Sequence, residues 1–146
     1  MKIRYYQKED LKEVTNFIIK NYRETFHKYP RLHDLDNLKN FYIFFLVAEQ
    51  NKKIIGTTAL IRINRRTGEI KRMFVKKSFR RKGLGKKLLN NIINKAKKLG
   101  IVKIKLYTST FNLPAVSFYQ KMGFKQTKSY NQGAKSGRTY LRMYLK

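Results

Sequence analysis

The sequence predicts one α/β domain built on a mixed sheet, with elements in the order βααβββαβαββ. Three observations support this class. Short segments alternate apolar and polar residues as strands do, longer segments carry apolar residues at helical spacing, and one such helix lies between two strands. The 146 residues, 42% of them hydrophobic, are enough for one core and too few for two. We therefore treat residues 1–146 as a single domain.

The first half of the chain contains the expected first strand, both early helices and three further strands. Residues 2–7 alternate as a strand, and a helix begins at Glu9 or Asp10 and continues to about Arg23 because apolar residues recur there at helical spacing. The next segments are a short helix between Leu32 and Asn40 and strands over Tyr42–Glu49, Ile54–Ile63 and Glu69–Val75. Turns are expected at residues 51–53 and 65–68.

The second half begins with a long helix over Gly85–Leu99, whose apolar residues form one stripe and which Gly100 ends. A strand over Val102–Thr108 follows, and then a helix that begins near Pro114 and ends at Gly123. The last two strands, Phe124–Tyr130 and Thr139–Leu145, pair around a Gly-rich loop. The strand–helix–strand unit over residues 69–108 should be parallel and right-handed.

The composition excludes several classes of protein. The chain has no Cys, which rules out disulfides, thiol chemistry and Cys-ligated zinc, and we expect no metal site. The longest apolar run, Phe41–Ala48, is too short to span a bilayer. No signal-peptide segment follows the N-terminal residues. We therefore expect a cytoplasmic protein without a membrane span.

The charge is strongly asymmetric along the chain. Lys and Arg number 35 against eight acidic residues, for a formal charge of +27, and Glu69 is the last carboxylate in the sequence. A half-molecule of this kind attracts polyanions such as nucleic acid, phosphates or CoA. An AT-rich genome would account for part of the lysine content, but it would not account for the scarcity of acidic residues.

The segment Arg80–Lys87 has the features of a phosphate-binding turn. It follows a strand, contains Gly83 and Gly85, and opens a helix whose first backbone N–H groups lack intrahelical partners. Cations in a first turn oppose the helix dipole by about 0.3–1 kcal/mol each, so Lys86 and Lys87 indicate a bound anion there. A tight turn beside a solvated basic face is the alternative. A dinucleotide-binding turn would need its third glycine where Leu88 stands.

Two motifs resemble those of the GNAT superfamily of N-acetyltransferases. The first is residues 75–85, a strand ending in Val followed by Arg80-Arg81-Lys82-Gly83-Leu84-Gly85; the second is residues 112–124, with Asn112, Ala115, Tyr119 and Gly123-Phe124 at the family's spacing. The resemblance covers nearly the whole chain and is weakest before Phe41. It implies a GNAT-like domain whose parallel fourth and fifth strands splay apart to admit acetyl-CoA as acetyl donor.

The resemblance also implies which residues contact the cofactor. The backbone of three residues at the end of the fourth strand should pair with the pantetheine arm, and amides of the glycine turn should hold the pyrophosphate. Asn112, after the fifth strand, should contact the cofactor near its thiol end. The implied cofactor-binding residues are Met73, Phe74, Val75, Arg80, Arg81, Lys82, Gly83, Leu84, Gly85, Lys86, Asn112, Ala115 and Tyr119.

Acetyl transfer to an amine needs a neutral amine, donors for the oxyanion and a proton for the departing thiolate. The resemblance assigns the proton to Tyr119, although its helical position also suits a core tyrosine. Glu69 matches a catalytic Glu of the lysine-acetylating branch, or it is a surface residue paired with Arg65 or Arg66. Other bases are water, His27 and His33, and the oxyanion donor is expected to be the Phe74 or Val75 N–H.

The acceptor is constrained only by charge. A protein of +27 repels polycations, so polyamines and aminoglycosides rank low, and a protein amine, such as one on a ribosome-associated protein, or a small acidic amine ranks high. Two alternatives remain open: a non-catalytic nucleic-acid-binding module that uses the basic half, and a sensor that binds CoA without turnover. The resemblance also allows a homodimer.

Overall fold

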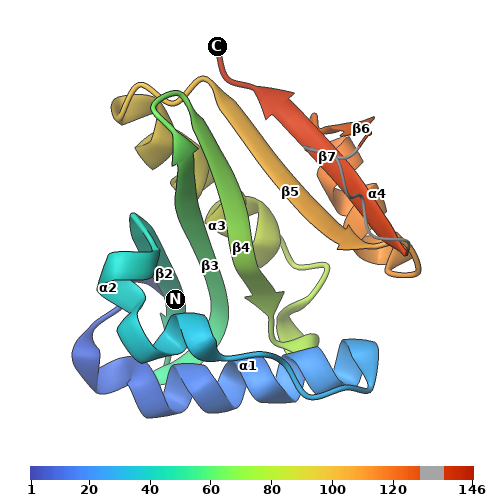
Figure 1. Cartoon of the computed structure of the whole chain (residues 1–146). Helices are drawn as coiled ribbons and strands as arrows, with labels where there is room; N and C mark the ends of the chain where they lie inside the picture. The colour runs from blue at the N-terminus through green and yellow to red at the C-terminus, as the bar shows by residue number, and fades with distance from the viewer. Residues whose placement is uncertain (129–136) are drawn as a thin grey trace.

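The protein is a single layered α/β structure, described by a computed structural model for residues 1–128 and 137–146. The seven strands of the described residues form one mixed sheet in the order β1-β2-β3-β4-β5-β7-β6, with helices on both faces (Figure 1). The strands are β1 (Lys2–Tyr5), β2 (Phe44–Gln50), β3 (Lys53–Asn64), β4 (Thr67–Val75), β5 (Lys103–Ser109), β6 (Lys125–Thr127) and β7 (Arg138–Tyr144). The helices are α1 (Leu11–Phe26), α2 (Leu38–Phe41), α3 (Leu84–Lys98) and α4 (Leu113–Lys121), with 3-10 turns η1 (Lys8–Asp10), η2 (His33–Asn37) and η3 (Lys77–Phe79).

The predicted element order is confirmed, and the differences lie at the boundaries. The first helix continues three residues past Arg23, and the second is shared between η2 and α2. The predicted turn over residues 65–68 was too long, because Thr67 and Gly68 already pair with β3 and only Arg65 and Arg66 turn the chain. The expected strand Phe124–Tyr130 is only Lys125–Thr127 within the described chain; its last two positions, and most of the Gly-rich loop, lie outside the described residues.

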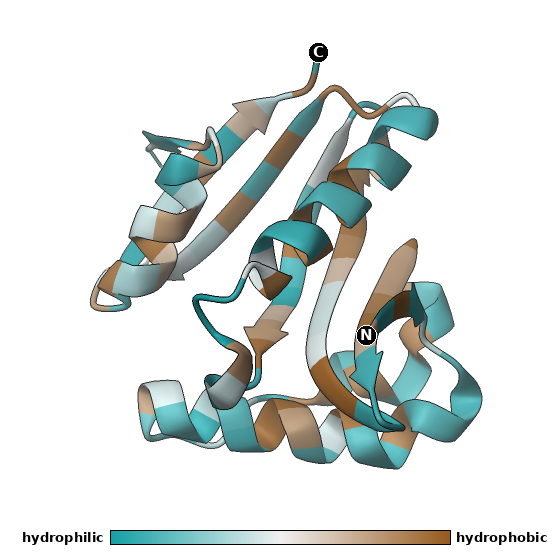
Figure 2. Ribbon diagram, turned by 180° about the vertical axis from the view of Figure 1, so that it is seen from behind, coloured by the Kyte–Doolittle hydropathy of each residue, from teal (hydrophilic) through white to brown (hydrophobic). Residues whose placement is uncertain are grey.

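Hydrophobic residues are buried on both faces of the sheet, because helices cover both faces. On one face α3 places its apolar stripe, including Leu89, Ile92 and Ala96, against β3, β4 and β5, while its charged side faces outward (Figure 2). On the other face Val14 and Ile18 of α1 pack with Leu35 and Leu38 over β2 and β3. Strands β3 and β4 are thus held from both sides, and this rigid centre supports the candidate site.

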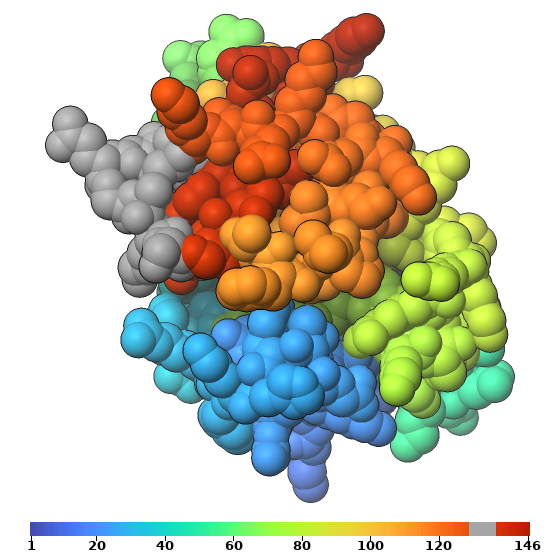
Figure 3. Space-filling model, turned by 90° about the vertical axis from the view of Figure 1, so that its right-hand side faces the viewer, coloured from blue at the N-terminus to red at the C-terminus, as the bar shows by residue number. Residues whose placement is uncertain are grey.

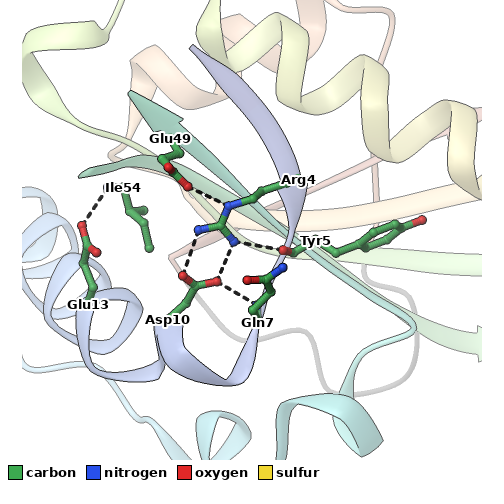
Figure 4. Close-up of polar contacts among 7 residues, drawn as sticks. All are labelled: Arg4, Tyr5, Gln7, Asp10, Glu13, Glu49 and Ile54. Carbon is green, nitrogen blue, oxygen red and sulfur yellow. Dashed lines mark hydrogen bonds and ion pairs between the residues drawn. The ribbon is translucent and has the colours of Figure 1, made fainter. Parts of the chain in front are cut away.

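The N-terminal segment is fixed to the sheet by polar contacts around Arg4 (Figure 4). Its guanidinium contacts Asp10 of η1 at 2.7 and 2.9 Å and Glu49 of β2 at 2.7 Å, while the Glu13 carboxylate of α1 accepts the Ile54 backbone N–H at 2.8 Å. The hydrogen bond from Arg4, aided by the Gln7 backbone N–H, holds the pKa of Asp10 below its usual value despite partial burial. These contacts set the direction in which α1 crosses the sheet.

Strands β4 and β5 run parallel but pair only at their beginning. The paired positions are Thr67–Lys103, Gly68–Ile104 and Glu69–Lys105. Beyond them β4 continues to Val75 and β5 to Ser109, but the two strands no longer pair with each other. Figure 1 shows the two strands diverging below this point. The predicted splayed, parallel pair is therefore confirmed. Glu69 lies at the point where the two strands separate, which we call the fork, and we call the opening between them beyond this point the split.

Candidate active site

A β-bulge in β4, close to the fork, changes the direction in which the following side chains point. Thr57 pairs with Phe74 and Ala59 with Lys71, so the single residue Thr58 lies opposite both Arg72 and Met73. Arg72 takes a left-handed conformation with φ 53°, which an L residue adopts only at some cost. As a result Arg72 projects toward η2, where regular alternation after Lys71 would direct it to the opposite face.

Arg72 uses this position to form a buried ion pair with Asp34 of η2. Its Nε and one terminal nitrogen lie 2.9 and 2.6 Å from the two carboxylate oxygens, and the guanidinium also donates to the Arg31 carbonyl. The Tyr42 hydroxyl donates to the same carboxylate, which is only 3% exposed. Burial acts to raise the pKa of Asp34, but the hydrogen bonds from Arg72 and Tyr42 outweigh it and hold that pKa below its usual value. The loop before β2 is thereby tied to the bulge.

Glu69 is buried at the fork, which contradicts the expected alternative of a surface residue paired with Arg65 or Arg66. Its side chain is 7% exposed, and its carboxylate lies 3.0 Å from the Lys71 ammonium. Lys71 in turn lies 3.3 Å from the Tyr107 hydroxyl and 4.5 Å from the centre of that ring. The carboxylate is therefore held at the bottom of the split by a neighbour on its own strand and not by the preceding turn.

At the end of β4, the backbone N–H and C=O groups of alternate residues point toward β3 and into the split. The Lys76 N–H donates to the Ile55 carbonyl, so alternation directs the polar groups of Phe74 toward β3 and those of Val75 away from it. The expected Phe74 N–H donor therefore does not face the split, while the Val75 N–H does. The Val75 carbonyl accepts a hydrogen bond from Arg80 Nε at 2.8 Å, which draws the following loop across the strand end.

The loop between β4 and α3 forms an anion-binding shape from its backbone. Arg81 and Gly83 have φ of 60° and 86°, and Gly83 caps α3 without any side-chain hydrogen bond. The amides of Leu84, Gly85 and Lys86 in the first turn therefore lack intrahelical acceptors. A Cβ atom on Gly85 would lie 3.3 Å from the Phe118 ring, so this glycine allows α3 and α4 to approach closely. The side chains of Arg81, Lys82 and Lys86 are exposed around these amides.

Helix α4 supplies the remaining predicted residues from the opposite side of the split. Tyr119 is 6% exposed, with ring centres 5.2 and 5.6 Å from those of Phe118 and Phe124. Within residues 1–128 and 137–146 its hydroxyl has no hydrogen-bond partner, and burial raises its pKa above the usual value. Asn112 caps α4 by accepting the Ala115 N–H at 3.4 Å, so part of its role is structural.

The two histidines do not join this group. His27 ends α1 in a left-handed conformation and is exposed, and His33 is exposed with its ring edge-on to Phe41. In the described part of the chain no cluster of His, Asp and Glu side chains could hold a metal ion.

These elements border one recess on the surface. Figure 3 shows α1, the segment from η3 into α3, and the segment from β5 into α4 meeting around it. One wall is the open edge of β4, which offers backbone groups to an extended chain. One rim is the uncapped, cationic start of α3. The shape therefore fits a ligand that has a long polar arm and a phosphate group.

Comparison with known proteins finds the same architecture and the same family. The model of the Acetyltransferase (GNAT) family matches residues 11–124. Human N-acetyltransferase 8 is 34% identical over 88 residues, which cover 57% of this chain and 39% of that protein. A GNAT-family acetyltransferase from Staphylococcus aureus Mu50 superposes with a TM-score of 0.91 at 30% identity, over 99% of both chains. The yncA putative acetyltransferase from Salmonella typhimurium, solved with acetyl-CoA, has a TM-score of 0.77 at 25% identity over 100% of this chain and 94% of its own.

The aligned segments span less than two thirds of the first curated relatives, from 39% to 60% of their length. No helix among the described residues is long and apolar enough to cross a membrane.

Proposed function

Because the chain belongs to the GNAT acetyltransferase family, we propose that it transfers an acetyl group from acetyl-CoA to an amine. The observation that carries this proposal is the open edge of β4 beyond the Glu69–Lys105 pair, lying beside the uncapped first turn of α3. Acetyl-CoA, when bound, supplies an activated thioester carbonyl. Groups of the protein bind the arm and the phosphates of acetyl-CoA, orient the thioester, and donate and accept the protons that the reaction moves.

The proposed cofactor-binding site consists mainly of backbone groups. Met73 and Val75 offer groups on the free edge of β4, and the amides after Gly83 hold the pyrophosphate in the field of the helix dipole. Arg80 binds the Val75 carbonyl and Asn21 of α1, so it shapes the loop and need not contact the phosphates itself. The exposed Lys82 and Lys86 add positive charge beside the same amides.

Tyr119 acts as the general acid in this proposal. Its raised pKa keeps the hydroxyl protonated at neutral pH, and its lack of a partner among the described residues leaves the proton available to a thiolate. The surrounding rings of Phe118 and Phe124 restrict the side chain to one position.

Glu69 acts as the base that receives a proton from the acceptor amine, directly or through one water. It lies buried at the fork on β4, the strand whose free edge is proposed to hold the cofactor, and the contact with Lys71 orients its carboxylate. The Val75 N–H, which points into the split six positions further along β4, is available to pair with the arm of the cofactor.

The proposed acceptor is a small acidic amine, or an amine of a protein such as a ribosome-associated protein. The positive charge around Glu69 supports both acceptors. The residues around Glu69 are Lys71, Lys105 and Tyr107, with Arg138 4.1 Å from the Tyr107 ring centre. These cations favour an acceptor with a carboxylate or phosphate near its amine and disfavour a polycation.

The experiment is a CoA-release assay on purified protein with a matched acceptor panel: an amine, the same amine bearing a carboxylate, spermidine, and peptides with free N-termini. We expect turnover to rise when the carboxylate is present and to be lowest with spermidine. Preference for spermidine would contradict the acceptor assignment, and absence of turnover with every amine, despite acetyl-CoA binding, would favour a sensor.

A further inference from the structure

The outer face of β5, β7 and β6 extends beyond the proposed acceptor site, which uses only its Lys105, Tyr107 and Arg138 positions. Ile104, Leu106 and Leu141 turn inward to the core that α3 and α4 complete, so their neighbours along each strand point to the opposite face. None of the helices in the described chain covers that face over β5 and β7, because α1 and α2 lie over β2, β3 and β4 (Figure 1).

The side chains on this face of the paired strands are mostly cations and tyrosines. The register sets Lys103 beside Tyr144, Lys105 beside Arg142, and Tyr107 beside Tyr140. Lys103 and Arg142 lie 5.4 and 5.0 Å from the centre of the Tyr144 ring, which remains 59% exposed. We call the residues Lys103, Lys125, Arg142 and Tyr144, which lie beyond the proposed acceptor site, the β5–β7 face.

The β5–β7 face carries no acidic side chain. Glu69 is the last acidic residue in the sequence, and it is already in contact with Lys71. Every ionised side chain that β5, β6 and β7 contribute is therefore basic. Holding such cations together costs free energy unless an anionic partner neutralises them, so a polyanion is the complementary ligand.

We propose that the β5–β7 face binds single-stranded nucleic acid. Phosphates would contact Lys103, Lys125 and Arg142, while a base stacks on the exposed ring of Tyr144. The aromatic rings distinguish this partner from an acidic peptide, whose carboxylates have no flat π surface to stack. An exposed ring on an open sheet face also suits unpaired bases better than a duplex, whose bases are enclosed.

The experiment measures fluorescence anisotropy of a labelled single-stranded 20-mer with the full chain, titrated at several salt concentrations. One variant combines Lys103→Gln, Lys125→Gln and Arg142→Gln, and a matched control removes the same charge from exposed positions on α1 and α2 with Lys12→Gln, Lys20→Gln and Lys39→Gln. We expect the face variant to weaken binding at least tenfold and to reduce the log–log salt slope by about 2, at about 0.7 for each phosphate that is no longer neutralised. The control should change affinity less than threefold.

Two further arms test the kind of partner. Tyr144→Leu should weaken single-strand binding at least about fivefold, because stacking is worth roughly 1–3 kcal/mol per base, and acetyl-CoA binding should be unchanged. A duplex of the same sequence and polyglutamate should both bind more weakly than the single strand. The proposal is overturned if the control triple variant loses as much affinity as the face variant, or if polyglutamate or the duplex binds as tightly.

Discussion

Arg72 and Asp34 are joined by two hydrogen bonds of 2.9 and 2.6 Å, although 38 residues separate them and both are largely buried. The contact exists because the bulge in β4 turns Arg72 toward η2. The loop before β2 is therefore tied to the strand that forms the proposed cofactor edge by a buried contact. Loss of this pair should affect stability first and substrate positioning second.

Asp34→Asn should destabilise the fold by about 3 kcal/mol, because it leaves the Arg72 guanidinium buried without a counter-charge. Denaturant unfolding followed by circular dichroism measures this. Asp36→Asn removes the same charge from an exposed position in the same turn, η2, and should change stability by less than about 0.5 kcal/mol. Equal effects of the two substitutions would show that the pair contributes nothing specific.

Acid should destabilise the protein through Asp34 and Asp10. The pKa of each is lower in the folded state than its ordinary value of about 3.9, so their contribution is fully present above that pH and is lost as the pH falls through the folded values. The urea midpoint should therefore fall steeply below about pH 4. Asp34→Asn should flatten this fall, and an unchanged acid limb in that variant would contradict the assignment.

Tyr119→Phe should lower kcat by about 10² to 10⁴ and leave acetyl-CoA affinity and stability nearly unchanged, since its hydroxyl makes no hydrogen bond to any described residue. Steady-state kinetics and calorimetry measure the two quantities. Tyr22→Phe, on α1, is the matched control and should keep full activity. A stable Tyr119→Phe variant with unchanged kcat would leave Tyr119 as a core residue only.

Glu69→Gln should reduce kcat/KM at pH 7 by about 10² or more, and raising the pH should restore part of the loss, because more of the acceptor amine is then neutral without help. Lys71→Gln breaks the same ion pair but keeps the carboxylate, so it should cost much less. A loss that is independent of pH, or equal in the two variants, would assign Glu69 a structural role.

Much of the fold could be predicted because its signals are local. The apolar stripe of α3, the glycines around it and the two motifs are all visible in short windows, and the parallel pairing follows from a right-handed connection. The bulge could not be predicted, because regular alternation fits β4 equally well and only its pairing with β3 shows two residues opposite Thr58. For Glu69 the sequence left a catalytic and a surface position open, and the structure shows that the side chain is buried.

The Arg72–Asp34–Tyr42 network was likewise missed, since its members belong to three separate elements. One signal was present: Asp34 is an acidic residue between Leu32 and Leu35, both of which turn toward the core. An acid in such a position indicates a buried partner, but nothing in the chain says which of 35 cations it is.

The most direct test of the central claim, that the split between β4 and β5 and the start of α3 hold acetyl-CoA, is a calorimetric titration with a glycine pair. Gly83 and Gly100 both have φ near 80° and open space where a Cβ would stand, so alanine should strain both alike. Only Gly83 lies at the proposed pyrophosphate site. We expect wild-type protein and Gly100→Ala to bind acetyl-CoA equally and Gly83→Ala to bind at least tenfold more weakly. Equal binding by both variants, or none by the wild type at millimolar acetyl-CoA, would contradict the account.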